Sequence, residues 1–215
     1  MNHIFSPDSK IFRVMNRMAD LVILNLIYFL TCLPVVTIGA ATAAMYTICF
    51  RMDTDRETNL IKPYLEAFRD NWKQATGLWI GLLLFGAAAV FDSMLFYNAA
   101  GILHFGFWVF APAAVFDFML IAVAFPLVSQ FRMPWKVILK NSVLLALGRF
   151  PTALGLGLLQ ALPLVLFFLN PALFLKIGFL WVLIYFSASA YLGSKLLKKA
   201  FAPLYSLSCS GSDSN

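Results

Sequence analysis

The stretch LPVVTIGAATAAMY, residues 33–46, decides how the first part of the chain is expected to fold. It lies inside a long apolar run between Arg17 and Arg51, in which Asp20 is the one charged residue. A membrane-spanning helix needs roughly 20 apolar residues to cross a hydrocarbon core of about 30 Å. The run is therefore too long for one upright helix and too short for two full spans.

Three residues of this stretch predict a break. Pro34 lacks a backbone donor and clashes with the preceding helical turn, so a helix should end before it. Gly39 gives the backbone freedom to reverse, and Thr37 lies between the two. We therefore expect a hairpin of two short helices, tight or re-entrant, with PVVTIG as its bend and the small residues after it packed closely on a neighbouring helix. The alternative, a signal peptide cleaved near Ala43, would place the basic segment after Arg51 outside the cell, against the positive-inside rule.

Composition predicts a membrane protein without the help of any motif. The chain is 61% hydrophobic and 12% charged, whereas soluble domains are about 45–50% apolar and about 25% charged. Backbone polar groups in lipid must pair within the chain, so long apolar runs form helices. We therefore predict an all-α, polytopic membrane helical bundle in one domain, residues 1–205, followed by a disordered polar tail, residues 206–215.

Four further apolar segments are long enough to cross a membrane, at about residues 74–96, 105–127, 150–169 and 173–193. With the first run they make about six transmembrane helices in three hairpins, which cover about 18–50, 74–127 and 150–193. The connections at 51–73 and 129–149 are rich in Lys and Arg, whereas 97–104 contains neither. The positive-inside rule therefore places both basic connections and both termini in the cytoplasm, in a multi-pass protein of the cell membrane.

Each expected hairpin is preceded by a segment with basic and apolar residues at helical spacing: SKIFRVMNRMADL, NLIKPYLEAFRDNWKQ and MPWKVILKNSVLLAL. In the third segment Arg132, Lys136 and Lys140 recur every four residues, which places them on one face of a helix. Such a helix lies in the headgroup plane. We therefore expect three cytoplasmic amphipathic helices in contact with membrane lipids. The simpler alternative is that any helix that enters a membrane begins with basic and aromatic residues.

No motif of known enzyme chemistry occurs in the sequence. There is no G-x-x-x-x-G-K-[ST] loop for ATP and no H-E-x-x-H metal site, and His3 and His104 are expected on opposite sides of the membrane. The basic residues give a net charge of +6, but they lie at the ends of apolar runs, where they set orientation. We therefore predict no catalytic activity, no cofactor, no metal and no nucleic-acid partner.

Two carboxylates within the expected spans are candidate functional side chains. Asp117 lies near the middle of its span, where a charged carboxylate costs about 2.5–3.5 kcal/mol unless it is neutral or partnered. It is either a hydrogen-bonded contact between helices or a functional site. Its available neutral partners are Asn25, Thr37, Gln160, Ser187 and Ser189. Asp92 lies near the outer end of its span, where the simpler interpretation is that it reaches water. In addition, Gly77-x-x-x-Gly81 is typical of close helix contacts.

The segment N25-x-x-Y-F-L-T-C-L-P-V-V-T-I-G-A-A-T-A-A-M-Y46 resembles the YesL family of bacterial membrane proteins, and FRDNWKQAT, residues 68–76, resembles that family's second recognisable stretch. Asn71 and Trp72 of the second stretch therefore join Pro34, Thr37 and Gly39 as candidate functional or packing positions. In that family the genes commonly lie beside those of sugar ABC transporter permeases and solute-binding proteins. The resemblance implies an accessory role in carbohydrate import, with ABC permease subunits as partners, and it implies no catalytic residues.

Two functional hypotheses follow. In the first, the chain is an accessory or assembly subunit associated with a carbohydrate ABC importer. In the second, it is a self-contained transporter or channel that uses Asp117 and the broken first hairpin as its site, because discontinuous helices near the midplane often form the sites of secondary transporters. A homo-oligomer is an alternative assembly.

Overall fold

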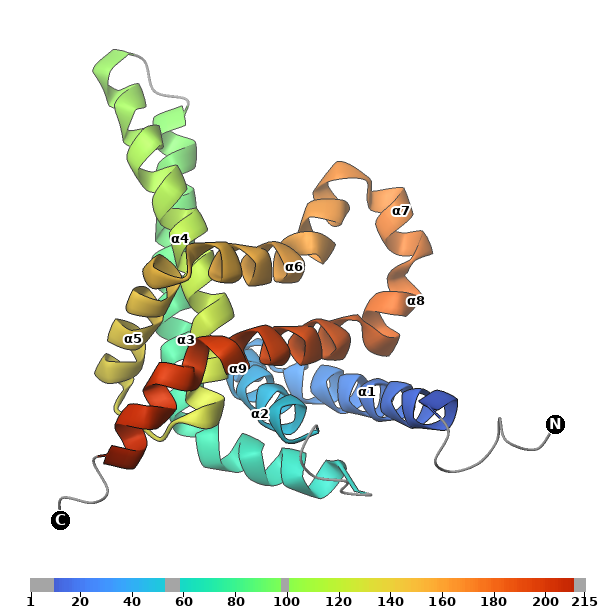
Figure 1. The fold of residues 1–215 in the computed structure, drawn as a ribbon. Helices are drawn as coiled ribbons and strands as arrows, with labels where there is room; N and C mark the ends of the chain where they lie inside the picture. Colours follow the sequence, from blue (N-terminus) through green and yellow to red (C-terminus); the bar gives the residue numbers. More distant parts are fainter. Residues whose placement is uncertain (1–9, 53–58, 98–100, 211–215) are drawn as a thin grey trace.

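The computed structural model of the chain describes residues 10–52, 59–97 and 101–210 (Figure 1). Every regular element in this part is helical, as expected. In chain order the elements are α1 (Lys10–Cys32), the 3-10 turn η1 (Val35–Thr37), α2 (Ile38–Arg51), α3 (Ile61–Tyr97), the 3-10 turn η2 (Gly101–His104), α4 (Phe105–Gln130), α5 (Trp135–Gly148), α6 (Phe150–Leu169), α7 (Pro171–Lys176), α8 (Gly178–Leu180), the π-helical turn η3 (Trp181–Tyr185) and α9 (Phe186–Ser210).

Several of these helices have the length and composition of membrane spans. Among the described residues the candidates are Val14–Cys32, Ile61–Tyr97, Leu103–Gln130, Phe150–Leu169 and Gly178–Phe201. The apolar segment Val35–Arg51 is shorter, and α2 within it covers only ~21 Å, less than a core of about 30 Å. The helices are those of a multi-pass membrane protein, and the described part contains five long candidate spans and one shorter apolar helix, where the sequence predicts about six transmembrane helices. The sidedness of the loops and termini stays a prediction.

The first hairpin bends where the sequence predicts it. α1 ends at Cys32, Pro34 is extended with φ −79° and ψ 116°, and η1 then leads directly into α2. The expectation of two short helices is wrong for the first of them, because α1 has 23 residues and α2 has 14. No Pro or Gly lies between Lys10 and Cys32, so nothing separates the basic N-terminal segment from the apolar one.

Two of the three expected amphipathic helices are likewise not separate helices. The first is part of α1, and the second is continuous with the following span in the 37-residue α3. Only the third forms a helix of its own, α5, because the chain is extended at Phe131 and Pro134 then precedes the first helical residue. At the other end of the chain, α9 continues to Ser210 and so includes the first half of the expected disordered tail, while residues 211–215 lie outside the described part.

α2 is the centre of the packed core. Residues 39–41 and 43–50 are buried, and α1, α3, α4 and α9 all contact this helix. The run of small residues that begins at Gly39 makes such close packing possible from several sides, as predicted. By contrast, the far end of the α3–α4 hairpin extends beyond α6 (Figure 1), and its large apolar side chains, such as Phe91 and Trp108, are exposed.

Candidate functional site

Asp117 lies in α4 and is the most unusual side chain of the core. It is 2% exposed, and its Oδ1 atom is buried without a hydrogen-bond partner among the described residues. The carboxyl packs against α3 at Gly86, where a side chain would collide with Oδ2 of Asp117. A buried polar atom without a hydrogen bond is costly, so the unpartnered Oδ1 makes Asp117 the candidate side chain to consider further.

The neutral side chains expected beside Asp117 bond elsewhere. Gln160 Nε2 donates to Tyr46 Oη at 3.0 Å, and the Ser189 hydroxyl donates to the Phe186 carbonyl oxygen at 2.8 Å. Thr37 lies in the η1 turn and bonds there. The side chain of Asn25 accepts a hydrogen bond from the Ser187 amide, and the Ser187 hydroxyl donates to a carbonyl oxygen of α1. Asp117 is therefore buried, and none of the five neutral candidates bonds to its Oδ1 atom in the described chain.

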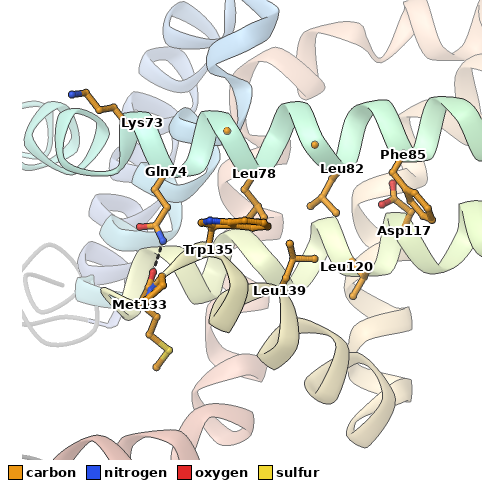
Figure 2. Close-up of a pocket in the computed structure, with 13 residues that line it drawn as sticks. Lys73, Gln74, Leu78, Leu82, Phe85, Asp117, Leu120, Met133, Trp135 and Leu139 are labelled. Atoms are coloured by element: carbon orange, nitrogen blue, oxygen red, sulfur yellow. Dashed lines mark hydrogen bonds between the residues drawn. The ribbon is translucent and has the colours of Figure 1, made fainter.

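A first cavity, of about 1010 Å³, lies between α3, α4 and α5, and Asp117 lines it. Figure 2 shows Asp117 beside Phe85 at one end of this cavity, and Gln74 at the other end, where its amide donates to the Met133 carbonyl oxygen. Trp135 of α5 lies between the two ends. Gly77 and Gly81 also line the cavity, and nothing lies within 4 Å of the position that a side chain on either would occupy. The expected close helix contact at these glycines is therefore absent within the described part of the chain.

A second cavity, of about 730 Å³, is lined by residues of α1, α2, α3, α4, α6 and α9, and Asp117 lines this one too. Its walls are mostly apolar and aromatic, and its polar groups include the bonded pair of Tyr46 and Gln160. No Lys, Arg or His occurs among its described lining residues. The carboxyl of Asp117 therefore lies at a wall shared by two cavities, and the second offers it no counter-charge.

Asn25 of α1 shows how this chain satisfies another buried polar group. Its side-chain amide donates to the carbonyl oxygens of Trp181 (3.0 Å) and Val182 (2.7 Å) in η3, and its Oδ1 accepts from the Ser187 amide (2.9 Å). The Ser187 hydroxyl in turn lies 2.7 Å from the Leu21 carbonyl oxygen of α1. A π-helical turn interrupts the regular pattern of backbone bonds, so Asn25 supplies the partners that the turn needs.

The turn at residues 33–37 is held by hydrogen bonds within the turn region and by one from α3. The Thr37 hydroxyl lies 2.7 Å from the carbonyl oxygens of both Thr31 and Pro34 and can donate to either, and Trp79 Nε1 donates to the Val35 carbonyl oxygen (3.0 Å). Gly39 does not provide the reversal, because it is already inside α2. A side chain at Gly39 would come within 2.6 Å of α3, so glycine is needed there for close helix packing.

The other candidate residues lie apart from Asp117. Asp92 is half-buried on α3 and lines neither of the two cavities. Asn71 donates to the Ala67 carbonyl oxygen of its own helix, and Trp72 is 49% exposed. Within the described ranges no group of three or more His, Cys, Asp or Glu side chains could hold a metal ion.

Two residues that help to shape the site escape the sequence reasoning. Trp79 lines the second cavity and also binds the η1 turn, so it links the first hairpin to the surroundings of Asp117. Gly86 provides the close approach of α3 to the carboxyl. An aromatic residue and a glycine in an apolar helix are common features of membrane spans, so neither stands out without the fold.

Comparison with known proteins identifies one segment. No curated protein and no solved structure matches the chain. Residues 21–93 match a family model described as "Protein of unknown function, DUF624". The match includes both stretches singled out above, residues 33–46 and 68–76, and it ends before α4. The matched segment, residues 21–93, carries most of α1, the first bend, α2 and most of α3, and over this part the chain is similar to the DUF624 family.

Proposed function

We propose that the chain is an accessory or assembly subunit that binds the permease subunits of a carbohydrate ABC importer in the membrane. The observation that carries this proposal is the open face of α3 at Gly77 and Gly81. A G-x-x-x-G pair in a membrane span lets a second helix approach closely, and no helix of the described chain uses it here. A transmembrane helix of a partner is the occupant that this face fits.

The walls beside these glycines support the same proposal. The first cavity is lined by apolar side chains of three helices, among them Leu78, Leu120 and Leu139. Helix association in lipid depends on van der Waals packing, which such walls provide. The basic residues Lys136 and Lys140 of α5 are predicted to hold this edge of the cavity at the cytoplasmic headgroups.

The kind of partner comes from the family resemblance. The two stretches that resemble the YesL family, whose genes commonly lie beside those of sugar ABC permeases, both fall inside the segment that matches DUF624. Carbohydrate permease subunits are therefore the partners that the proposal names.

Co-purification tests the proposal. The tagged chain is isolated from its own cell in mild detergent, and attached proteins are identified by mass spectrometry. We expect stoichiometric permease subunits with the wild type and their loss with the double variant Gly77→Leu, Gly81→Leu. Gly155→Leu is the matched control, because Gly155 of α6 also has nothing within 4 Å of the added side chain. Recovery of the chain alone, or only as a homo-oligomer, would contradict the proposal.

A second candidate function, a self-contained transporter or channel, is favoured by the second cavity. Ile38 and Thr42 at the start of α2 line it together with Asp117, so the broken hairpin and the buried carboxyl share one space, as in sites built on discontinuous helices. Uptake by reconstituted vesicles with the wild type and with Asp117→Asn tests it: a carrier that depends on the carboxyl loses uptake in the variant, whereas an accessory subunit shows none in either case.

A further inference from the structure

We propose that the second cavity is a binding site for a lipophilic organic cation, whose positive charge rests on the Asp117 carboxylate and whose apolar body lies against the aromatic walls. The proposal goes beyond the accessory role and does not depend on it, because it needs no partner chain.

The charge of the ligand follows from the unpaired carboxyl. Asp117 is 2% exposed, its Oδ1 has no hydrogen-bond partner in the described chain, and it lines a cavity that has no basic side chain among its described residues. A buried carboxylate is stabilised by an opposite charge that enters the same low-dielectric space. A cation supplies the counter-charge that the described lining of this cavity lacks.

The organic nature of the ligand follows from the walls. Aromatic rings surround the space, including those of Tyr46, Trp79, Phe118, Phe125 and Phe186. Ring faces attract ammonium and similar cations, most strongly where water is excluded. Because no group of three acidic, His or Cys side chains exists in the described part of the chain, the cavity suits a large organic cation better than a metal ion, and its volume of about 730 Å³ lies within the usual range for small-molecule sites.

The route of entry indicates that the ligand is soluble in the membrane. Floor residues such as Tyr46 and Ala190 are almost fully buried, at 1% exposure each, whereas Val90, Met94 and Leu164 at the rim are exposed and apolar. All three rim residues lie in candidate membrane spans. The cavity therefore opens toward lipid, and a ligand reaches it from the bilayer.

Equilibrium binding to the purified full chain in lipid nanodiscs tests the proposal with two probes. Tetraphenylphosphonium is a lipophilic cation, and tetraphenylborate is an anion of nearly the same shape. We expect saturable binding of the cation by the wild type, and Asp117→Asn should weaken it at least about tenfold, which corresponds to about 1.4 kcal/mol. The anion should not lose affinity in this variant. Asp92→Asn, in which the replaced carboxyl lines neither cavity, should bind like the wild type.

A second pair of variants tests the location independently of the charge. Ala87 is exposed and lines the second cavity, whereas its neighbour Ala88 is exposed and does not. Ala87→Phe should fill the mouth and weaken cation binding at least about tenfold, while Ala88→Phe should leave it unchanged. Equal affinity for the two probes, unchanged cation affinity in Asp117→Asn, or unchanged cation affinity in Ala87→Phe would each overturn the proposal.

Discussion

The contacts of Asn25 and those of Asp117 show two opposite treatments of a polar side chain within apolar helices. Asn25 is fully buried and makes three hydrogen bonds to η3 and to the start of α9. Asp117 is almost as buried, yet its Oδ1 has no partner in the described chain and two cavities meet beside it. Around Asn25, between α1, η3 and the start of α9, the buried side chain is fully bonded, whereas beside Asp117 two cavities lie next to a polar atom that has no partner in the described chain. This difference is the basis on which we propose a ligand and a partner helix near Asp117.

The largest expected effect is a loss of stability when Asn25, whose side-chain amide is fully hydrogen-bonded, is replaced. Asn25→Leu leaves two carbonyl oxygens of η3 and the Ser187 amide without their side-chain partners. At about 1–3 kcal/mol for a buried unpaired group, we expect a loss of about 3 kcal/mol of unfolding free energy. Thermal unfolding in detergent can be followed by a thiol-reactive dye at Cys49, which is fully buried. Asn71→Leu is the control, because in the described part of the chain the hydrogen bond of Asn71 lies within its own helix; equal losses in the two variants would contradict the role given to Asn25.

The next effect concerns the close packing of α2. In Gly39→Ala the added methyl group would lie 2.6 Å from both the Ala75 carbonyl oxygen and Trp79 Cβ of α3. Because these atoms belong to a helix backbone and to the base of a side chain, they cannot move aside cheaply. We expect a loss of about 2 kcal/mol, within the range for an overpacked core, in the same unfolding assay. Wild-type stability in this variant would mean that α2 and α3 do not approach each other as described.

The first bend and the buried position of Asp117 can be predicted from single residues. Pro34 ends α1 because it cannot continue a helix, and an apolar span places Asp117 at depth. The continuity of α3 could not be predicted, because basic residues mark a headgroup region but do not break a helix. The role of Gly39 was assigned wrongly for a related reason: a glycine permits both a reversal and a close approach, and only the position of α3 distinguishes them. The unpaired state of Asp117 depends on its neighbours, which sequence order does not reveal.

Replacement of Asp117, whose Oδ1 atom has no hydrogen-bond partner in the described chain, is expected to raise the stability rather than lower it. Asp117→Ala removes a carboxyl whose Oδ1 makes no hydrogen bond and improves helix propensity. We expect the unfolding free energy to rise by about 1 kcal/mol, since burial of an unpaired polar group carries a cost of that order. The measurement is the same unfolding assay in the absence of any organic cation. Asp92→Ala serves as the control and should change stability by less; a destabilised Asp117→Ala would show that the carboxyl has a partner within the fold.

The smallest expected change in stability is at Gly77, on the open face of α3. Gly77→Ala adds a methyl group where nothing lies within 4 Å, so the gain in helix propensity of up to about 1 kcal/mol is not opposed by a clash. The isolated chain should therefore unfold at a slightly higher temperature, in contrast to the loss expected from the same change at Gly39. In the cell, however, the proposed partner helix needs this face to be flat, so the recovery of permease subunits should fall even though the chain itself is more stable. A variant that gains stability and still recovers the full complement of permease would leave Gly77 without a role in assembly, and the partner's contact would then have to lie elsewhere on the molecule.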